Sequence, residues 1–145
     1  MFDQIYGWEY TLLKPSDFWK QVPDALKPIY HFFNSPISAG SVDSDSPLRF
    51  IKEMVREEDY LSFKLDIDTP EIEIPIVLNI AKDPELWNLI DEFFFEFHFR
   101  CEILMYCAWE NKMPAVFQGL ILDRPNAMHL FASLREKGIR AHFWP

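Results

Sequence analysis

Hydrophobic and polar positions follow two spacings along this chain, and each spacing predicts one kind of element. Short apolar runs rich in β-branched and aromatic residues predict buried strands. The expected strands are Ile5 to Trp8, Ile29 to Phe33, Tyr60 to Asp66, Phe93 to Phe99 and Ile139 to Trp144. Apolar residues three and four positions apart predict amphipathic helices between them. The expected helices are Pro15 to Val22, Pro47 to Glu58, Glu71 to Ala81, Pro84 to Ile90 and Asp123 to Gly138.

Strands that alternate with helices are typical of βαβ units, so the predicted fold is α/β, with a mostly parallel sheet flanked by helices. The run Phe93-Phe94-Phe95 needs apolar cover on both faces. We therefore expect a central, buried strand here, next to the strand at Tyr60 to Asp66. Pro75 is expected in the first turn of its helix, where no backbone N–H donor is needed.

Composition limits the classes of protein to consider. With 145 residues, 49% of them hydrophobic, the chain is expected to form one domain over residues 1–145. A net charge of −9 predicts repulsion from phosphate backbones, so we expect no nucleic-acid partner. Cys101 and Cys107 have neither zinc nor redox spacing and are expected to be core thiols of an intracellular, reducing compartment. The first residues do not resemble a targeting segment, and charges interrupt the apolar stretch from Phe93 to Trp109, so no membrane span is expected.

Two carboxylates come at the end of the strand predicted at Tyr60 to Asp66. Asp66 and Asp68 are two residues apart, a spacing that puts both side chains on one face of an extended chain. Ligands of open α/β sheets bind at the carboxyl ends of strands, so these acids are candidates for contact with a cofactor or substrate. The alternative is a structural role, in which they cap the N–H groups of the next helix.

A second polar pair, Glu96 and His98, lies on the aromatic strand with the same spacing. Together with Asp66 this pair offers three ligands of the histidine-plus-carboxylate kind that divalent metals use. A hydrogen-bonded core histidine is the competing interpretation. A metal-dependent hydrolase that uses Asp66, Asp68 and His98 therefore stays open as one class of function.

The segment from Lys64 to Glu73, which reads Lys-Leu-Asp-Ile-Asp-Thr-Pro-Glu-Ile-Glu, resembles a motif of FkbM-like methyltransferases. These are Rossmann-like enzymes that use S-adenosylmethionine. Phe94 to His98 resembles the family's fifth strand, and Ile5 to Glu9 resembles its second strand, whose terminal acid binds the cofactor ribose. The helix and strand from Asn126 to Trp144 resemble its closing unit.

The resemblance implies a Rossmann-like fold and methyl transfer from S-adenosylmethionine to an oxygen of a small molecule or sugar. It implies that Asp66 and Asp68 lie at the reacting end, that His98 acts as a base, and that Glu9 binds the cofactor.

The chain departs from this family in its glycines. The family's glycine-rich loop precedes the segment that ends at Glu9, whereas this sequence begins at Met1, and its four glycines, at positions 7, 40, 119 and 138, cannot form such a loop. Thr69-Pro70 also replaces the family's Gly-Ala. We therefore expect a fold that is incomplete at its amino terminus, as a fragment of a longer enzyme or as a domain that lost the loop. Weak or absent binding of S-adenosylmethionine is expected, since only glycine lets a backbone approach the cofactor closely.

The rival function is a non-catalytic domain that serves as an interaction or structural subunit. The missing glycine loop favours this function, whereas the acids at three strand ends favour the enzyme. An incomplete sheet would leave some of its aromatic residues uncovered, and exposed apolar patches mark partner sites. In that case we expect a protein partner that covers an exposed aromatic flank.

Overall fold

The computed structural model describes residues 2–98 and 116–144. The chain divides into two compact units, Met1–Ser38 and Ala39–Pro145, and each has its own sheet. Three expectations fall outside the described residues: a strand that continues to Phe99, core thiols at Cys101 and Cys107, and the interrupted apolar stretch as far as Trp109.

The first unit is a two-stranded parallel sheet with helices in its connection. β1 (Ile5–Trp8) pairs with β2 (Tyr30–Phe33), and α1 (Pro15–Gln21) and the 3-10 helix η1 (Lys27–Ile29) lie between them in sequence. Phe18 of α1 stacks on Phe32 of β2 with ring centroids 3.7 Å apart, so the helix covers one face of this sheet. Both strands were predicted, the second with one residue more.

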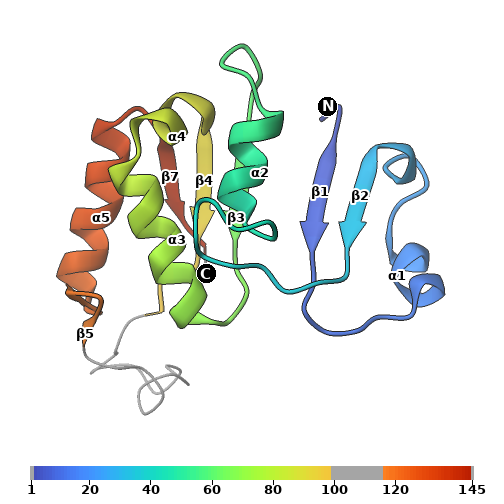
Figure 1. Cartoon of the computed structure of the whole chain (residues 1–145), viewed down its shortest axis with the longest axis horizontal. Coiled ribbons are helices and arrows are strands. Elements are labelled where there is room, and N and C mark those ends of the chain that lie inside the picture. The colour runs from blue at the N-terminus through green and yellow to red at the C-terminus, as the bar shows by residue number, and fades with distance from the viewer. Residues whose placement is uncertain (1, 99–115, 145) are drawn as a thin grey trace. The chain divides into compact units, whose positions relative to one another are not determined.

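The second unit contains a three-stranded parallel sheet in the order β3-β4-β7 (Figure 1). Its strands are β3 (Ser62–Leu65), β4 (Glu92–Phe95) and β7 (Arg140–Phe143). Its helices are α2 (Pro47–Met54), α3 (Pro70–Lys82), α4 (Pro84–Leu89) and α5 (Arg124–Glu136). The described residues also form a short antiparallel pair, β5 (Val116–Phe117) and β6 (Leu120–Ile121), which is too short for periodicity to predict. The small parallel sheets flanked by helices confirm the α/β class.

β4 is the central strand of its sheet and lies next to β3, as the triple phenylalanine predicted. Phe93 and Phe95 are fully buried, and Phe95 stacks on Phe131 of α5 at 6.2 Å. Phe94, on the other face, is only half-buried, and its ring stacks on that of His142 at 4.7 Å. An aromatic neighbour on the adjacent strand therefore covers part of this third ring. The prediction of a central strand is confirmed, and burial is complete for Phe93 and Phe95 but only partial for Phe94.

The strands end earlier than the apolar pattern predicted. β4 ends at Phe95 because its partner β7 ends at Phe143. One more backbone hydrogen bond follows, in which the Trp144 N–H donates to the Phe95 carbonyl. β3 likewise ends at Leu65. The polar residues that follow both strands are therefore outside the regular sheet, at its carboxyl edge.

α3 contains a proline in its second turn, so the expectation that Pro75 lies in the first turn was wrong. The helix begins at Pro70, with Thr69 at its N-cap, which makes Pro75 its sixth residue. A proline there removes a backbone hydrogen bond. The helix persists because its apolar face is fully buried around the proline, with Ile74, Ile76 and Val77.

None of the helices formed by residues 2–98 and 116–144 has the length and apolar character that crossing a membrane requires.

The N-cap of α5 is expected to contribute measurably to stability. Asp123 accepts a hydrogen bond through Oδ1 from the Asn126 backbone N–H at 2.8 Å. Asp123→Ala is expected to lower the free energy of unfolding by about 1 kcal/mol, the usual loss for such a cap. Urea denaturation measures the loss, with Arg124→Ala, at the exposed first residue of the helix, as the control. Equal stabilities for the two variants would show that the cap contributes nothing.

Candidate functional site

The polar residues at the carboxyl edge of β3 and β4 lie in and around the loop that joins β3 to α3. Asp68, in this loop, has a backbone φ of 54°, a left-handed conformation that few residues other than glycine adopt. Aspartate tolerates it better than most residues do. Because the strand ends at Leu65, this turn, and not strand alternation, sets the direction of the Asp68 side chain.

Glu73 of α3 holds the loop in place. Its Oε1 accepts the backbone N–H of Ile67 at 3.0 Å and its Oε2 accepts that of Thr69 at 3.2 Å. The side chain is 1% exposed, so both bonds are protected from water. Glu73 therefore fixes the backbone on both sides of Asp68.

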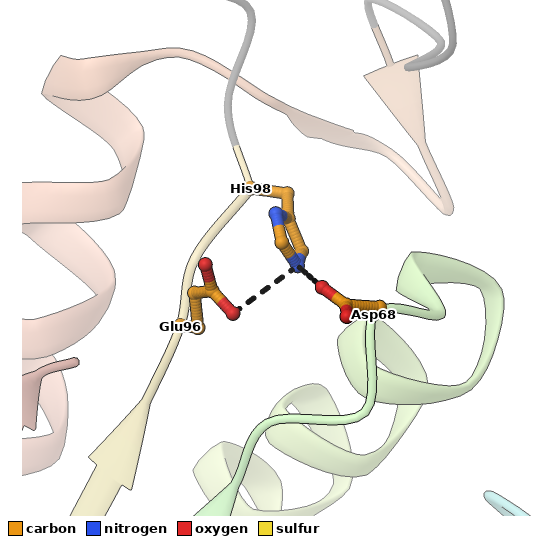
Figure 2. Close-up of side chains that lie close together, drawn as sticks. All are labelled: Asp68, Glu96 and His98. Atoms are coloured by element: carbon orange, nitrogen blue, oxygen red, sulfur yellow. Dashed lines mark ion pairs between the residues drawn. The ribbon is translucent and has the colours of Figure 1, made fainter. Parts of the chain in front are cut away.

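His98 lies opposite this loop and faces three carboxylates. Its Nε2 is 3.7 Å from Asp68 Oδ1, 3.7 Å from Glu73 Oε2 and 3.8 Å from Glu96 Oε2. Figure 2 shows Glu96 and His98 on the segment that leaves β4, and Asp68 reaching towards the imidazole from the other side. Asp66, Asp68 and the Glu96/His98 pair are expected at one edge of the sheet, because parallel strands end on the same side, and the distances confirm this. The distances exceed those of good hydrogen bonds, so the groups face one another across a small gap.

Asp66 is at the same edge but has other partners. Lys64 Nζ is 2.6 Å from Asp66 Oδ2, and a hydrogen bond links Asp66 to Glu96. Burial raises the pKa of the Asp66 carboxyl, but the bonds from Lys64 and Glu96 outweigh burial and hold it below its usual value. Its charge is thus balanced locally by a lysine.

Burial and crowding raise the pKa of the two other carboxyls in this site. For Glu73, burial raises the pKa to about 7, although the N–H groups of Ile67 and Thr69 oppose the change. For Glu96, burial and then the hydrogen bond with Asp66 raise the pKa to about 7. Carboxyls that bind protons near neutral pH are a common property of functional sites.

The pKa of His98 moves in the opposite direction. Burial lowers it, and the nearby charges of Asp68 and Asp66 only partly restore it. The imidazole is therefore neutral at pH 7, since the usual pKa of histidine is already below 7. A neutral imidazole has one nitrogen lone pair, which can accept a proton or bind a cation.

Glu9, the predicted cofactor-binding acid, belongs to the first unit and directly follows β1. Its Oε1 accepts a hydrogen bond from the Thr11 backbone N–H at 2.6 Å, which stabilises the turn after the strand. Its own N–H donates to the Phe33 carbonyl at 3.0 Å. These contacts give Glu9 a structural role, and the ribose contact stays a prediction.

Glu73 is a residue of this site that the sequence analysis did not identify as a candidate. Its position in the sequence contains the signal, because Glu73, Val77 and Ile80 are spaced as one face of a helix. A carboxylate on an apolar face is buried on folding and must find hydrogen-bond donors there. The pattern could have identified a buried acid, but not its two donors in the preceding loop.

In the part of the chain that the structure describes, Asp68, Glu96 and His98 form a group of ligand atoms that all lie within 4.8 Å of one another. Oxygen and imidazole donors so close together suit proton transfer or cation binding. No protein-family model, no curated protein and no solved structure matches the chain.

Proposed function

We propose that the chain is a Rossmann-like, methyltransferase-like domain that transfers a methyl group from S-adenosylmethionine to an oxygen of a small molecule or sugar. One observation carries the proposal. The two segments that resemble FkbM-like methyltransferases, residues 64–73 and 92–98, are far apart in sequence but supply Asp68, Glu96 and His98 to one cluster. That cluster lies at the carboxyl edge of a parallel sheet, where α/β enzymes bind their ligands.

The charges at this edge suit the reaction. Methyl transfer to oxygen forms a C–O bond, breaks the C–S bond of a positively charged sulfonium, and releases the proton of the acceptor hydroxyl. Carboxylates attract the sulfonium, and a carboxylate or neutral imidazole takes up the proton. Asp68 is the most accessible of these groups, with 72% of its side chain exposed, so substrate reaches the cluster from its side.

The second candidate is the non-catalytic interaction domain. Two observations favour it: the four glycines cannot form a cofactor loop, and two large apolar side chains after β1 are strongly exposed. Tyr10 is 80% exposed and Leu12 is 88% exposed. Apolar side chains grouped in an exposed loop are typical of a surface that another protein covers.

Titration with S-adenosylmethionine separates the two candidates. We expect binding weaker than micromolar, because hydrogen bonds to charged groups contribute roughly 1.5–3 kcal/mol each and micromolar affinity requires about 8 kcal/mol. Glu9→Ala is expected to weaken the binding further by about tenfold, the equivalent of about 1.4 kcal/mol. Calorimetry, extended to millimolar ligand by NMR, measures both dissociation constants.

The control is Glu53→Gln, a change at an exposed acid on α2, which should leave the dissociation constant unchanged. No binding at millimolar ligand would contradict the methyltransferase and favour the interaction domain. Micromolar binding of S-adenosylmethionine that disappears in Glu9→Ala would establish cofactor binding. It would also show that tight binding does not need the glycine-rich loop.

A further inference from the structure

We propose that Asp68, Glu96 and His98 form a binding site for a divalent transition-metal ion, with His98 Nε2 and one oxygen of each carboxylate as ligands. This inference goes beyond the proposed function and does not require methyl transfer. It stands on the types of donor atom, on their distances and on the burial of the histidine.

The distances fit a small divalent ion. In tetrahedral sites, metal–nitrogen and metal–oxygen bonds of about 2.0–2.2 Å separate neighbouring ligand atoms by about 3.4 Å. His98 Nε2 is 3.7 Å from Asp68 Oδ1 and 3.8 Å from Glu96 Oε2. All three ligand atoms lie within 4.8 Å of one another, so the ligands would draw closer together around a bound ion. At these distances a cation fits between the groups, whereas direct hydrogen bonds between them would be long.

The histidine lies on the buried side of the gap. Its side chain is only 4% exposed, while Asp68 on the other side of the gap is 72% exposed. Nε2 points towards Asp68 and Glu96 (Figure 2). The arrangement combines a buried nitrogen donor with an open side through which an ion and a further ligand can enter.

Asp66 and Glu73 also lie near His98, but each is engaged by other partners, which leaves Asp68 and Glu96 as the carboxylate ligands. Asp66 forms an ion pair with Lys64 at 2.6 Å, and this pairing distinguishes it from Asp68. Glu73, although 3.7 Å from Nε2, accepts two backbone N–H groups of the loop. The ligand set therefore includes Asp68 in place of the Asp66 considered from the sequence, and Glu73 fixes the loop that presents Asp68.

The donor set also selects the kind of metal. Imidazole suits Zn²⁺, Co²⁺ and Fe²⁺, whereas Mg²⁺ prefers six oxygen ligands in an octahedron. We therefore expect Zn²⁺ and Co²⁺ to bind at least tenfold more tightly than Mg²⁺. In the proposed reaction, such an ion would bind the acceptor oxygen at the open side and lower the pKa of its hydroxyl.

The test is direct titration of the full chain, stripped with a chelator, with Zn²⁺ by calorimetry and with Co²⁺ by visible absorption. We expect one Zn²⁺ per chain, with at least tenfold weaker binding in Asp68→Asn, which changes an exposed side chain and should not disturb folding. The ¹⁵N resonance of His98 Nε2 should shift when Zn²⁺ is added. Glu71→Gln and His142→Gln are matched controls, since Glu71 is an exposed acid of α3 and His142 pairs with Glu92 at another place. Both controls should bind Zn²⁺ as the unmodified chain does.

Equal Zn²⁺ affinity in the unmodified chain and Asp68→Asn, or an unchanged His98 resonance, would overturn the site. Loss of Zn²⁺ binding in His142→Gln alone would also overturn it, because it would locate the ion at the pair with Glu92. The outcome is separate from that of the S-adenosylmethionine titration, which is made without metal. A chain that binds Zn²⁺ through Asp68 but no S-adenosylmethionine keeps this site and loses the proposed methyl transfer.

Discussion

Replacement of Phe95 by alanine is expected to lower the free energy of unfolding of the second unit by about 3–5 kcal/mol, the usual range for a buried phenylalanine. Phe95 is 1% exposed at the centre of the three-stranded sheet. Its ring lies 5.8 Å from that of Phe93, 5.7 Å from that of Phe97 and 6.2 Å from that of Phe131. The alanine would lose this apolar contact area and leave a cavity that three rings cannot fill without moving.

Urea denaturation followed by circular dichroism gives the change in free energy. The control is Met128→Ala, at a half-exposed position of α5, where we expect a loss below about 0.5 kcal/mol. A loss below about 1 kcal/mol for Phe95→Ala would mean that the aromatic core around β4 is not packed as described.

The second large effect is a pH dependence of stability that originates in Glu73. Burial raises the pKa of Glu73 from 4.5 to about 7 in the folded chain. The folded state therefore holds this proton more tightly than the unfolded state. The stabilisation is fully present below pH 4.5 and is lost as pH rises to about 7. At 1.36 kcal/mol for each pKa unit, the loss is on the order of 3 kcal/mol.

Glu73→Gln removes this titration and keeps the size of the side chain. Relative to the unmodified chain, the glutamine variant should gain on the order of 3 kcal/mol of unfolding free energy between pH 4.5 and pH 8. Urea denaturation at a series of pH values, with a chelator present, measures the difference. Glu71→Gln, an exposed change on the same helix, should follow the unmodified chain at every pH. A constant difference between Glu73→Gln and the unmodified chain would mean that Glu73 is not buried.

Local sequence patterns predicted most of the elements. The strands β1, β2, β3, β4 and β7 and the helices from α1 to α5 were expected from apolar spacing and from residues that begin helices. Helix starts are predictable because they depend on neighbouring residues. In Ser46-Pro47, Asp83-Pro84 and Asp123-Arg124-Pro125, a capping side chain accepts a backbone N–H and a proline occupies the first turn. The ends of strands were less predictable, because a strand ends where its partner ends. The partner of β4 is β7, which comes far later in the chain.

The chain itself determined which residues could meet in a site. Acids and a histidine directly after two apolar strands have to lie at one edge if the strands are parallel neighbours, and the sequence contained both strands and both polar pairs. The central position of Phe93 to Phe95 followed from the same reasoning, since so many large apolar side chains in succession cannot face water.

Only the tertiary structure decided which of these groups face one another and in what state of charge. Asp68, and not Asp66, faces His98, because the left-handed turn at Asp68 and the ion pair of Asp66 with Lys64 direct the two carboxylates differently. Glu73 acquired its role when folding placed its carboxylate against two loop N–H groups. Distances and burial set hydrogen bonds and pKa values, and both depend on residues brought together from distant parts of the chain. No local pattern of residues can encode them.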